Sequence, residues 1–180
     1  MGPARFPNGL EVRAAVELRA IPGRRLEGYA ARFDVEACIG EVREVIRPGA
    51  FLSTLANPAH DILALVDHEP GALLGRTSSG TLKLAEDSRG LHFEIAVPDT
   101  QLGRDVLAQA ERNDLGGCSF GFRPIEVRWP KADFRELLGV DLVEISVVRA
   151  FPAYSQTSVV ARSLPPRISD LQRRRLVGIM

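Results

Sequence analysis

Apolar and polar residues alternate along much of this chain, which is the pattern of β-strands that bury one face. Segments with this alternation, or with short apolar runs, are expected as strands at residues 10–21, 25–35, 41–49, 61–70, 118–129, 134–140 and 141–151. Residues 80–98 predict a hairpin with its turn at 86–90. Pro22-Gly23 predicts a turn between the first two strands.

A different period, that of an amphipathic helix, appears in residues 98–114. The apolar residues that repeat there at helical spacing are Leu102, Val106 and Ala110. Asp99 or Thr100 can cap the start of this helix, and Asn113-Asp114 with the glycines that follow ends it. A short helix is also expected at residues 50–55. Many strands with few helices predict an α+β, β-rich domain, either a barrel or a mixed arrangement, and disfavour alternating βαβ units.

Composition narrows the class of protein. The 180 residues suggest one domain with a real core. Lys plus Arg and Asp plus Glu are equal at 23 each, so no basic excess favours a nucleic-acid-binding module. Cys38 and Cys118 form neither a disulfide framework nor a zinc-site spacing, which fits a reducing intracellular setting. No apolar segment predicts a signal peptide or a membrane span.

The first candidate for chemistry is Ser119, in the pattern Gly117-x-Ser119-x-Gly121. In α/β-hydrolases this pattern carries a nucleophilic serine, and the triad histidine follows that serine in the chain. All three histidines of this chain precede Ser119, so that arrangement is excluded. Ser119 is therefore either a nucleophile in another triad order or a small residue where two backbones pass closely.

A base and an acid are needed if Ser119 is a nucleophile. His68 ends an apolar strand in "LVDHEP", just before a Pro-Gly pair expected to turn, and is either a functional or a surface histidine. His60 is expected in solvent, and His92 on the exposed face of a hairpin strand. Glu144 stands in an apolar strand and must have a partner if it is buried.

Strict alternation bears on these candidates in two places. It places Leu142, Glu144 and Ser146 on one face of their strand, so Glu144 can equally face solvent. On the other strand, only one of Cys118 and Ser119 can face a given site. We expect Ser119 to face it and Cys118 to pack in the core.

Taken in order, several segments resemble the prohead proteases of tailed phages, the capsid-maturation serine peptidases. The resemblance covers roughly residues 12–162. The segments that carry it are "GYAARF", "EVIRPGAF", "LVDHEP", "LLGRT", "TLKLAEDSRGLHFEIAVPDT", "GRDVLAQAERND", "GGCSFGF" and "LVEISVVRAFPAYSQTSV". It is specific because these motifs occur together and in this order.

The resemblance implies a fold and a site. That family is similar to the herpesvirus assemblins, which implies an antiparallel β-barrel flanked by helices, with the serine and histidine on neighbouring strands. Carried over residue by residue, the catalytic triad falls on His68, Ser119 and Glu144. Arg149 is a candidate for helping the oxyanion hole, against the plainer reading of an exposed arginine. No metal or cofactor is implied.

The implied function is a serine endopeptidase that cleaves scaffold and capsid-protein segments during phage head maturation, together with cleavage of itself. Its partners are then the major capsid protein and the scaffold, with self-association also expected, and neither nucleic acid nor membrane. It acts in the host cytoplasm, inside the assembling prohead. The domain organisation follows as an N-terminal extension at 1–11, a protease domain at 12–162 and a Pro- and Arg-rich tail at 163–180.

Rival functions stay open. A scaffold or assembly module of the same fold without catalysis is the main alternative, and an esterase is another. Labelling of Ser119 by a serine-directed probe would distinguish a peptidase from the non-catalytic module. A capsid-protein cleavage assay would distinguish a peptidase from an esterase.

Overall fold

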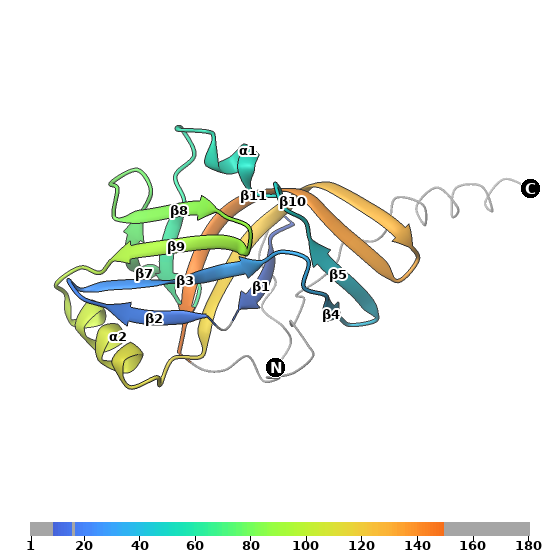
Figure 1. Cartoon of the computed structure of the whole chain (residues 1–180). Coiled ribbons are helices and arrows are strands. Elements are labelled where there is room, and N and C mark those ends of the chain that lie inside the picture. Colours follow the sequence, from blue (N-terminus) through green and yellow to red (C-terminus); the bar gives the residue numbers. More distant parts are fainter. Residues whose placement is uncertain (1–8, 16, 150–180) are drawn as a thin grey trace, which may run out of the picture.

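Two β-sheets make up most of the computed structural model, which describes residues 9–15 and 17–149 (Figure 1). Of these residues, 56% lie in strands and 11% in helices. The seven-stranded sheet contains β1 (Glu11–Ala15), β4 (Ala37–Ile39), β5 (Val42–Ile46), β6 (Leu63–Val66), β7 (Glu69–Arg76), β10 (Gly117–Lys131) and β11 (Phe134–Val148). The four-stranded sheet contains β2 (Leu18–Ile21), β3 (Arg25–Arg32), β8 (Leu82–Glu86) and β9 (Gly90–Ala96).

The two sheets bury one apolar core, to which aromatic side chains from both contribute. Phe120 of β10 stacks on Phe122 and meets the ring of Phe51 edge-on, while Phe93 of β9 is fully buried. Rings of this size bury large apolar areas, so they account for much of the stabilisation of the fold. The helix α1 (Leu52–Leu55) lies against β11, and α2 (Gln101–Glu111) lies beside β2 and β3 (Figure 1).

β11 organises the larger sheet because it pairs with three other strands. It runs antiparallel to β10 along its length, parallel to β5 near its start and parallel to β6 near its end. The mixed pairing differs from the expected antiparallel barrel, and no closed barrel is found in the described ranges. An assemblin-like fold is likewise not confirmed.

A β-bulge at Val143 changes which side chains share a face of β11. Glu144 pairs with Gly121, while Leu142 pairs with the next residue, Phe122, so Val143 has no partner of its own on β10. Such an extra residue reverses the alternation beyond it. Leu142 therefore lies in the core, and Glu144 faces the other side. The expectation that Leu142 and Glu144 share a face was wrong for this reason.

Two further strand expectations needed correction. Residues 10–21 form two strands, β1 and β2, which belong to different sheets. Residues 134–140 and 141–151 were expected as two strands, but one continuous strand, β11, runs from Phe134 to Val148. Periodicity indicates that a segment is extended, but it does not tell which strands pair with it.

The helices and turns follow the sequence signals more closely. Thr100 is the N-cap of α2, and its hydroxyl accepts a hydrogen bond from the backbone of Gly103 at 3.2 Å. The helix ends just before Asn113, which adopts a left-handed φ of 59°. The expected hairpin is β8 and β9, and the expected turn at Pro22-Gly23 joins β2 to β3.

Within the described residues, no helix is long and apolar enough to cross a membrane. The predicted tail at 163–180 lies outside the described residues, and the proposed domain boundaries stay predictions.

Candidate active site

Ser119 lies on β10, facing away from the aromatic core. It is 2% exposed, and its Cα partners are Ala14 on β1 and Ser146 on β11. Its hydroxyl donates a hydrogen bond to the backbone carbonyl of Arg13 at 2.8 Å. The proton of Ser119 therefore points toward β1 in this structure.

Cys118, the neighbouring candidate nucleophile, faces the opposite side of the strand. It belongs to the hydrophobic core, as expected. Burial strongly raises the pKa of its thiol, and the negative charge of Glu144 adds to this effect. Because the thiolate is the reactive form, this cysteine is a poor nucleophile.

His68 lies in the tight turn between β6 and β7, rather than at the end of a strand. Asp67 and His68 both have positive φ, at 50° and 61°, between the paired residues Val66 and Glu69. Two positive φ values in a two-residue loop define a type I′ hairpin turn. The Pro-Gly pair that was expected to form this turn lies inside β7 instead.

Contacts with the end of β11 hold this turn in place. The backbone N–H of Asp67 donates to the carbonyl of Val147 at 2.9 Å. Arg149 donates to the Asp67 carboxylate from its backbone at 2.9 Å and from its guanidinium Nε at 2.6 Å. Arg149 thus anchors the turn that carries His68, and its side chain is 53% exposed. The carboxylate of Asp67 is thus bound to this arginine.

Glu144 makes direct contact with His68. Its Oε1 lies 2.7 Å from the imidazole Nδ1, and its Oε2 accepts a hydrogen bond from the hydroxyl of Ser146 at 2.5 Å. The residue is only 5% exposed. Both carboxylate oxygens therefore have polar partners, which meets the cost of burying this group.

Gly121 makes room for that carboxylate. A Cβ built on Gly121 would collide with Oε1 of Glu144. The second glycine of the Gly-x-Ser-x-Gly pattern is thus explained by the packing of Glu144. Because Ser119 and Gly121 are alternate residues of β10, the acid, the imidazole bound to it and Ser119 all lie on one face of the sheet.

The three predicted residues are thus brought to one region, but not onto neighbouring strands. β11 lies between β10, which carries Ser119, and β6, which leads to His68. The implied placement of Ser119 and His68 on adjacent strands was wrong in this respect. His68 and Glu144 are in contact, whereas the Ser119 hydroxyl is bound to Arg13.

The other two histidines have different surroundings. His60 was expected in solvent, but its Nε2 is 2.7 Å from the carbonyl of Leu142 and 3.3 Å from the carboxylate of Asp141. His92 lies on the face of β9 opposite Leu91, with its ring edge-on to another aromatic, Tyr29.

Sequence reasoning did not identify Ser146, Gly121 or Arg13 as parts of this region. The signal for Ser146 was its position two residues after Glu144, which places both on one face of a strand. Gly121 was noted only as part of a motif. No sequence signal pointed to Arg13, because its carbonyl reaches Ser119 through strand pairing.

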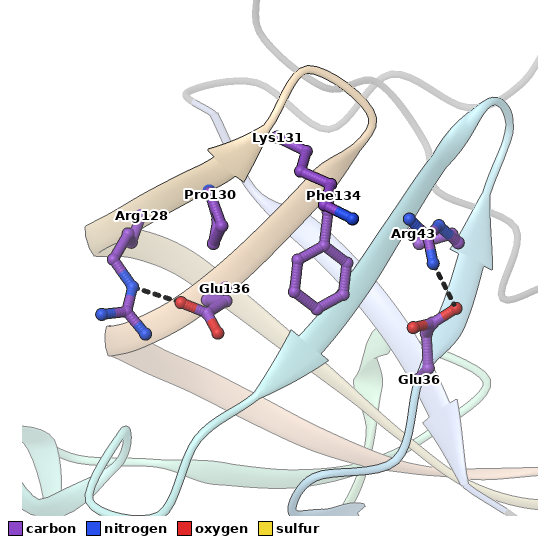
Figure 2. Close-up of a pocket in the computed structure, with 7 residues that line it drawn as sticks. All are labelled: Glu36, Arg43, Arg128, Pro130, Lys131, Phe134 and Glu136. Atoms are coloured by element: carbon purple, nitrogen blue, oxygen red, sulfur yellow. Dashed lines mark hydrogen bonds and ion pairs between the residues drawn. The ribbon is translucent and has the colours of Figure 1, made fainter.

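Two cavities in the described part of the chain are lined by residues other than His68, Ser119 and Glu144. One, of about 470 Å³, lies between the β4–β5 hairpin and the part of the β10–β11 hairpin next to its turn (Figure 2). Ion pairs of Arg128 with Glu136 and of Arg43 with Glu36 line it. The other, of about 340 Å³, lies beside α1 and His60. Among the described residues, no cluster of three or more His, Cys, Asp or Glu side chains is placed to hold a metal ion.

Comparison with known proteins gives the family. A family model described as the caudovirus prohead serine protease matches residues 11–167, a range that contains His68, Ser119 and Glu144. No curated protein and no solved structure matches the chain. A relation to the herpesvirus assemblins therefore stays a prediction. Since the family model spans most of the chain, including every strand and helix of the structure, the chain belongs to the caudovirus prohead serine protease family.

Proposed function

We propose that this chain is a serine endopeptidase in which Ser119 is the nucleophile, His68 the general base and Glu144 the acid that orients it. Membership in the family implies a serine hydrolase of phage capsid maturation. The observation that best supports the assignment of residues is the contact of 2.7 Å between His68 Nδ1 and a nearly buried Glu144. An acid bound to one imidazole nitrogen is the arrangement by which triads prepare a base.

Glu144 sets the tautomer of His68. A carboxylate accepts hydrogen bonds, so the proton of the ring is placed on Nδ1 and the basic lone pair on Nε2. The same carboxylate stabilises the imidazolium that forms when His68 takes a proton. Burial of Glu144 strengthens this interaction, because little water screens it.

The reaction then follows the acyl-enzyme route. His68 removes the proton of Ser119 as the hydroxyl oxygen attacks the scissile carbonyl, and it returns that proton to the leaving amine. In the second half of the reaction, His68 takes a proton from water as the water oxygen attacks the acyl carbonyl. It then gives a proton to the oxygen of Ser119 as the ester bond breaks and the acyl group leaves. For the first attack, the Ser119 hydroxyl must exchange its bond to the Arg13 carbonyl for one to His68. Catalytic hydrogen bonds often form fully only when substrate is bound.

We further propose that the substrates are the scaffold and scaffold-like segments of the major capsid protein, cleaved inside the assembling prohead. The family membership supports this substrate class. Cleavage of the chain by itself and self-association belong to the same proposal.

A non-catalytic assembly module of the same family is the second candidate. The observation that favours it is the Ser119 hydroxyl, which is 2% exposed and bound to a backbone carbonyl. In this second candidate the Ser119 hydroxyl joins β10 to β1 and has no catalytic role.

The test combines a fluorophosphonate probe with a cleavage assay on the capsid protein. Wild-type protein should be labelled at Ser119 and should shorten the capsid protein, while Ser119→Ala should do neither. Ser79→Ala, which changes an exposed loop serine, is the matched control and should behave as wild type. Labelling without capsid cleavage would favour an esterase. Absence of both, even with assembled proheads, would favour the assembly module.

A further inference from the structure

Ser146 joins the candidate acid to the turn that carries the candidate base. It lies on β11 and is 0% exposed. Its hydroxyl donates to Oε2 of Glu144 at 2.5 Å and accepts a hydrogen bond from the backbone N–H of His68 at 3.1 Å. One hydroxyl therefore holds both the carboxylate and the backbone of the histidine.

These two contacts restrain different motions. The bond to Oε2 fixes the rotation of the Glu144 carboxylate, so that Oε1 remains directed at His68. The bond from the His68 N–H fixes the position of the type I′ turn relative to β11. A hydroxyl has one proton to donate, and that of Ser146 goes to the carboxylate, the stronger charge-assisted partner.

The contacts of the Ser146 hydroxyl point to a positioning role at this site. Its proton is committed to Glu144 and its side chain is out of contact with solvent. The buried hydroxyl of Thr54 in α1, by comparison, binds two backbone groups of β11, the carbonyl of Val140 at 2.7 Å and the N–H of Leu142 at 3.2 Å. Ser146 instead contacts the two residues proposed as acid and base.

We propose that Ser146 is a positioning residue, which aligns the Glu144 carboxylate with the His68 imidazole. This inference rests on the proposed function, in which these two side chains act as acid and base. Ser146 acts through them and touches neither the substrate nor the reacting atoms.

The first experiment observes the proton on His68 Nδ1 by NMR in a Ser119→Ala background, which prevents self-cleavage. In the parent, this proton should resonate far downfield and exchange slowly with water. In Ser146→Ala it should move upfield and exchange about 10-fold faster or more, because hydrogen bonds to charged groups are strong enough for such a change. Ser146→Cys, with its weak S–H donor, should give an intermediate shift and stands in if Ser146→Ala does not fold.

Thr54→Val is the matched control. It also removes a buried hydroxyl that binds the backbone of β11, through Val140 and the N–H of Leu142. It should lower stability without changing the His68 resonance. If Thr54→Val and the Ser146 variants change that resonance equally, or if neither changes it, the inference is overturned.

The second experiment measures turnover in otherwise wild-type enzyme. Ser146→Ala should lower kcat about 10-fold and leave KM nearly unchanged, since a misaligned acid impairs the transition state and not substrate binding. Thr54→Val should leave both close to wild type. A rise in KM with unchanged kcat would contradict a positioning role.

The two readouts separate failure of the inference from failure of the proposed function. If wild-type protein cleaves nothing but Ser146→Ala still alters the His68 resonance, the proposed function fails and the positioning of His68 by Ser146 stands. If wild-type protein cleaves its substrate but the resonance and kcat are unaffected in Ser146→Ala, the function stands and the inference is rejected.

Discussion

The carboxylate of Glu144 occupies the space that a side chain on Gly121 would require. These two residues are Cα partners on β11 and β10, so the acid lies over the neighbouring strand. The backbone of Gly121 does not have a positive φ, so nothing but this packing calls for glycine here.

Gly121→Ala tests this relationship. The added methyl group must displace Glu144 from His68, so we expect turnover to fall at least about 10-fold and stability to fall by roughly 1–3 kcal/mol, as overpacking usually costs. Peptidase assays and urea unfolding measure the two effects. Gly139→Ala on β11 is the control. Its new Cβ would lie 3.3 Å from the nearest atom, the Cβ of Glu126, which is a tight contact but not a collision. Equal activity of the two variants would contradict the proposed role of Glu144.

Glu144→Gln should lower kcat by up to about 10⁴-fold, because an amide can present a donor to Nδ1 and favour the wrong tautomer. It should still leave more activity than Ser119→Ala, since the acid makes no bond to substrate. Asp67→Asn is the matched comparison, because the carboxylate of this neighbouring acid binds Arg149. Full activity of Glu144→Gln combined with a loss in Asp67→Asn would move the acid role to Asp67.

A buried group of four charges joins β1 to the rest of the larger sheet. Arg13 binds Glu44 and Glu11, each at 2.6 Å, while Arg135 binds Glu11 at 2.8 Å and Glu44 at 3.0 Å. All four residues are at most 3% exposed. Burial alone would lower the pKa of Arg13, but its hydrogen bonds and attraction to Glu44 and Glu11 outweigh this and raise the pKa.

Glu44→Gln should destabilise the protein by about 3–5 kcal/mol, because it leaves two buried arginines with one carboxylate. Arg123→Gln, which breaks the more exposed pair with Asp141, should cost about 1 kcal/mol or less. Urea unfolding of both variants in the Ser119→Ala background checks this. Similar losses for the two would show that the buried group contributes no more than a surface pair.

The contribution of Asp61, which lies just before β6, to the stability of the protein should depend on pH only in the acid range. Hydrogen bonds from Arg76 and from the backbone of Ser78 lower the pKa of Asp61 to about 2. Because the pKa of Asp61 is lower in the folded than in the unfolded protein, its ionised form stabilises the fold. This stabilisation is fully present above the unfolded pKa of about 3.9. It is lost as the pH falls through the folded pKa of about 2. The stability difference between wild type and Asp61→Asn should therefore shrink over this range. An Asp61 carboxyl that titrates near pH 3.9 by NMR would contradict this.

The C-terminal tail gives a prediction about self-processing. The sequence after Arg162 is polar and interrupted by prolines, which suits it to cleavage. Wild-type enzyme expressed with its capsid protein should lose mass from this end, whereas Ser119→Ala and His68→Ala should retain it. Intact-mass measurement decides the matter. Loss of the same segment from Ser119→Ala would assign the cleavage to a host protease.

Local patterns in the sequence were enough to predict the elements that depend on neighbouring residues. The helix from Gln101 to Glu111 follows from its apolar period and the Thr100 cap, and the hairpin of β8 and β9 from alternation around a turn. The identity of the three candidate residues also came from the sequence, through motifs that occur in a fixed order. These signals are short-range, so they can be read without knowing the fold.

Only the tertiary structure decided how the strands pair and what each polar group contacts. The bulge at Val143 places Glu144 opposite the core, and the parallel pairing of β6 with β11 brings His68 to it. Strand pairing likewise directs the Ser119 hydroxyl to the carbonyl of Arg13. Such contacts join residues far apart in the chain, and their formation depends on core packing and backbone hydrogen bonding over the whole sheet, which no local pattern of residues encodes.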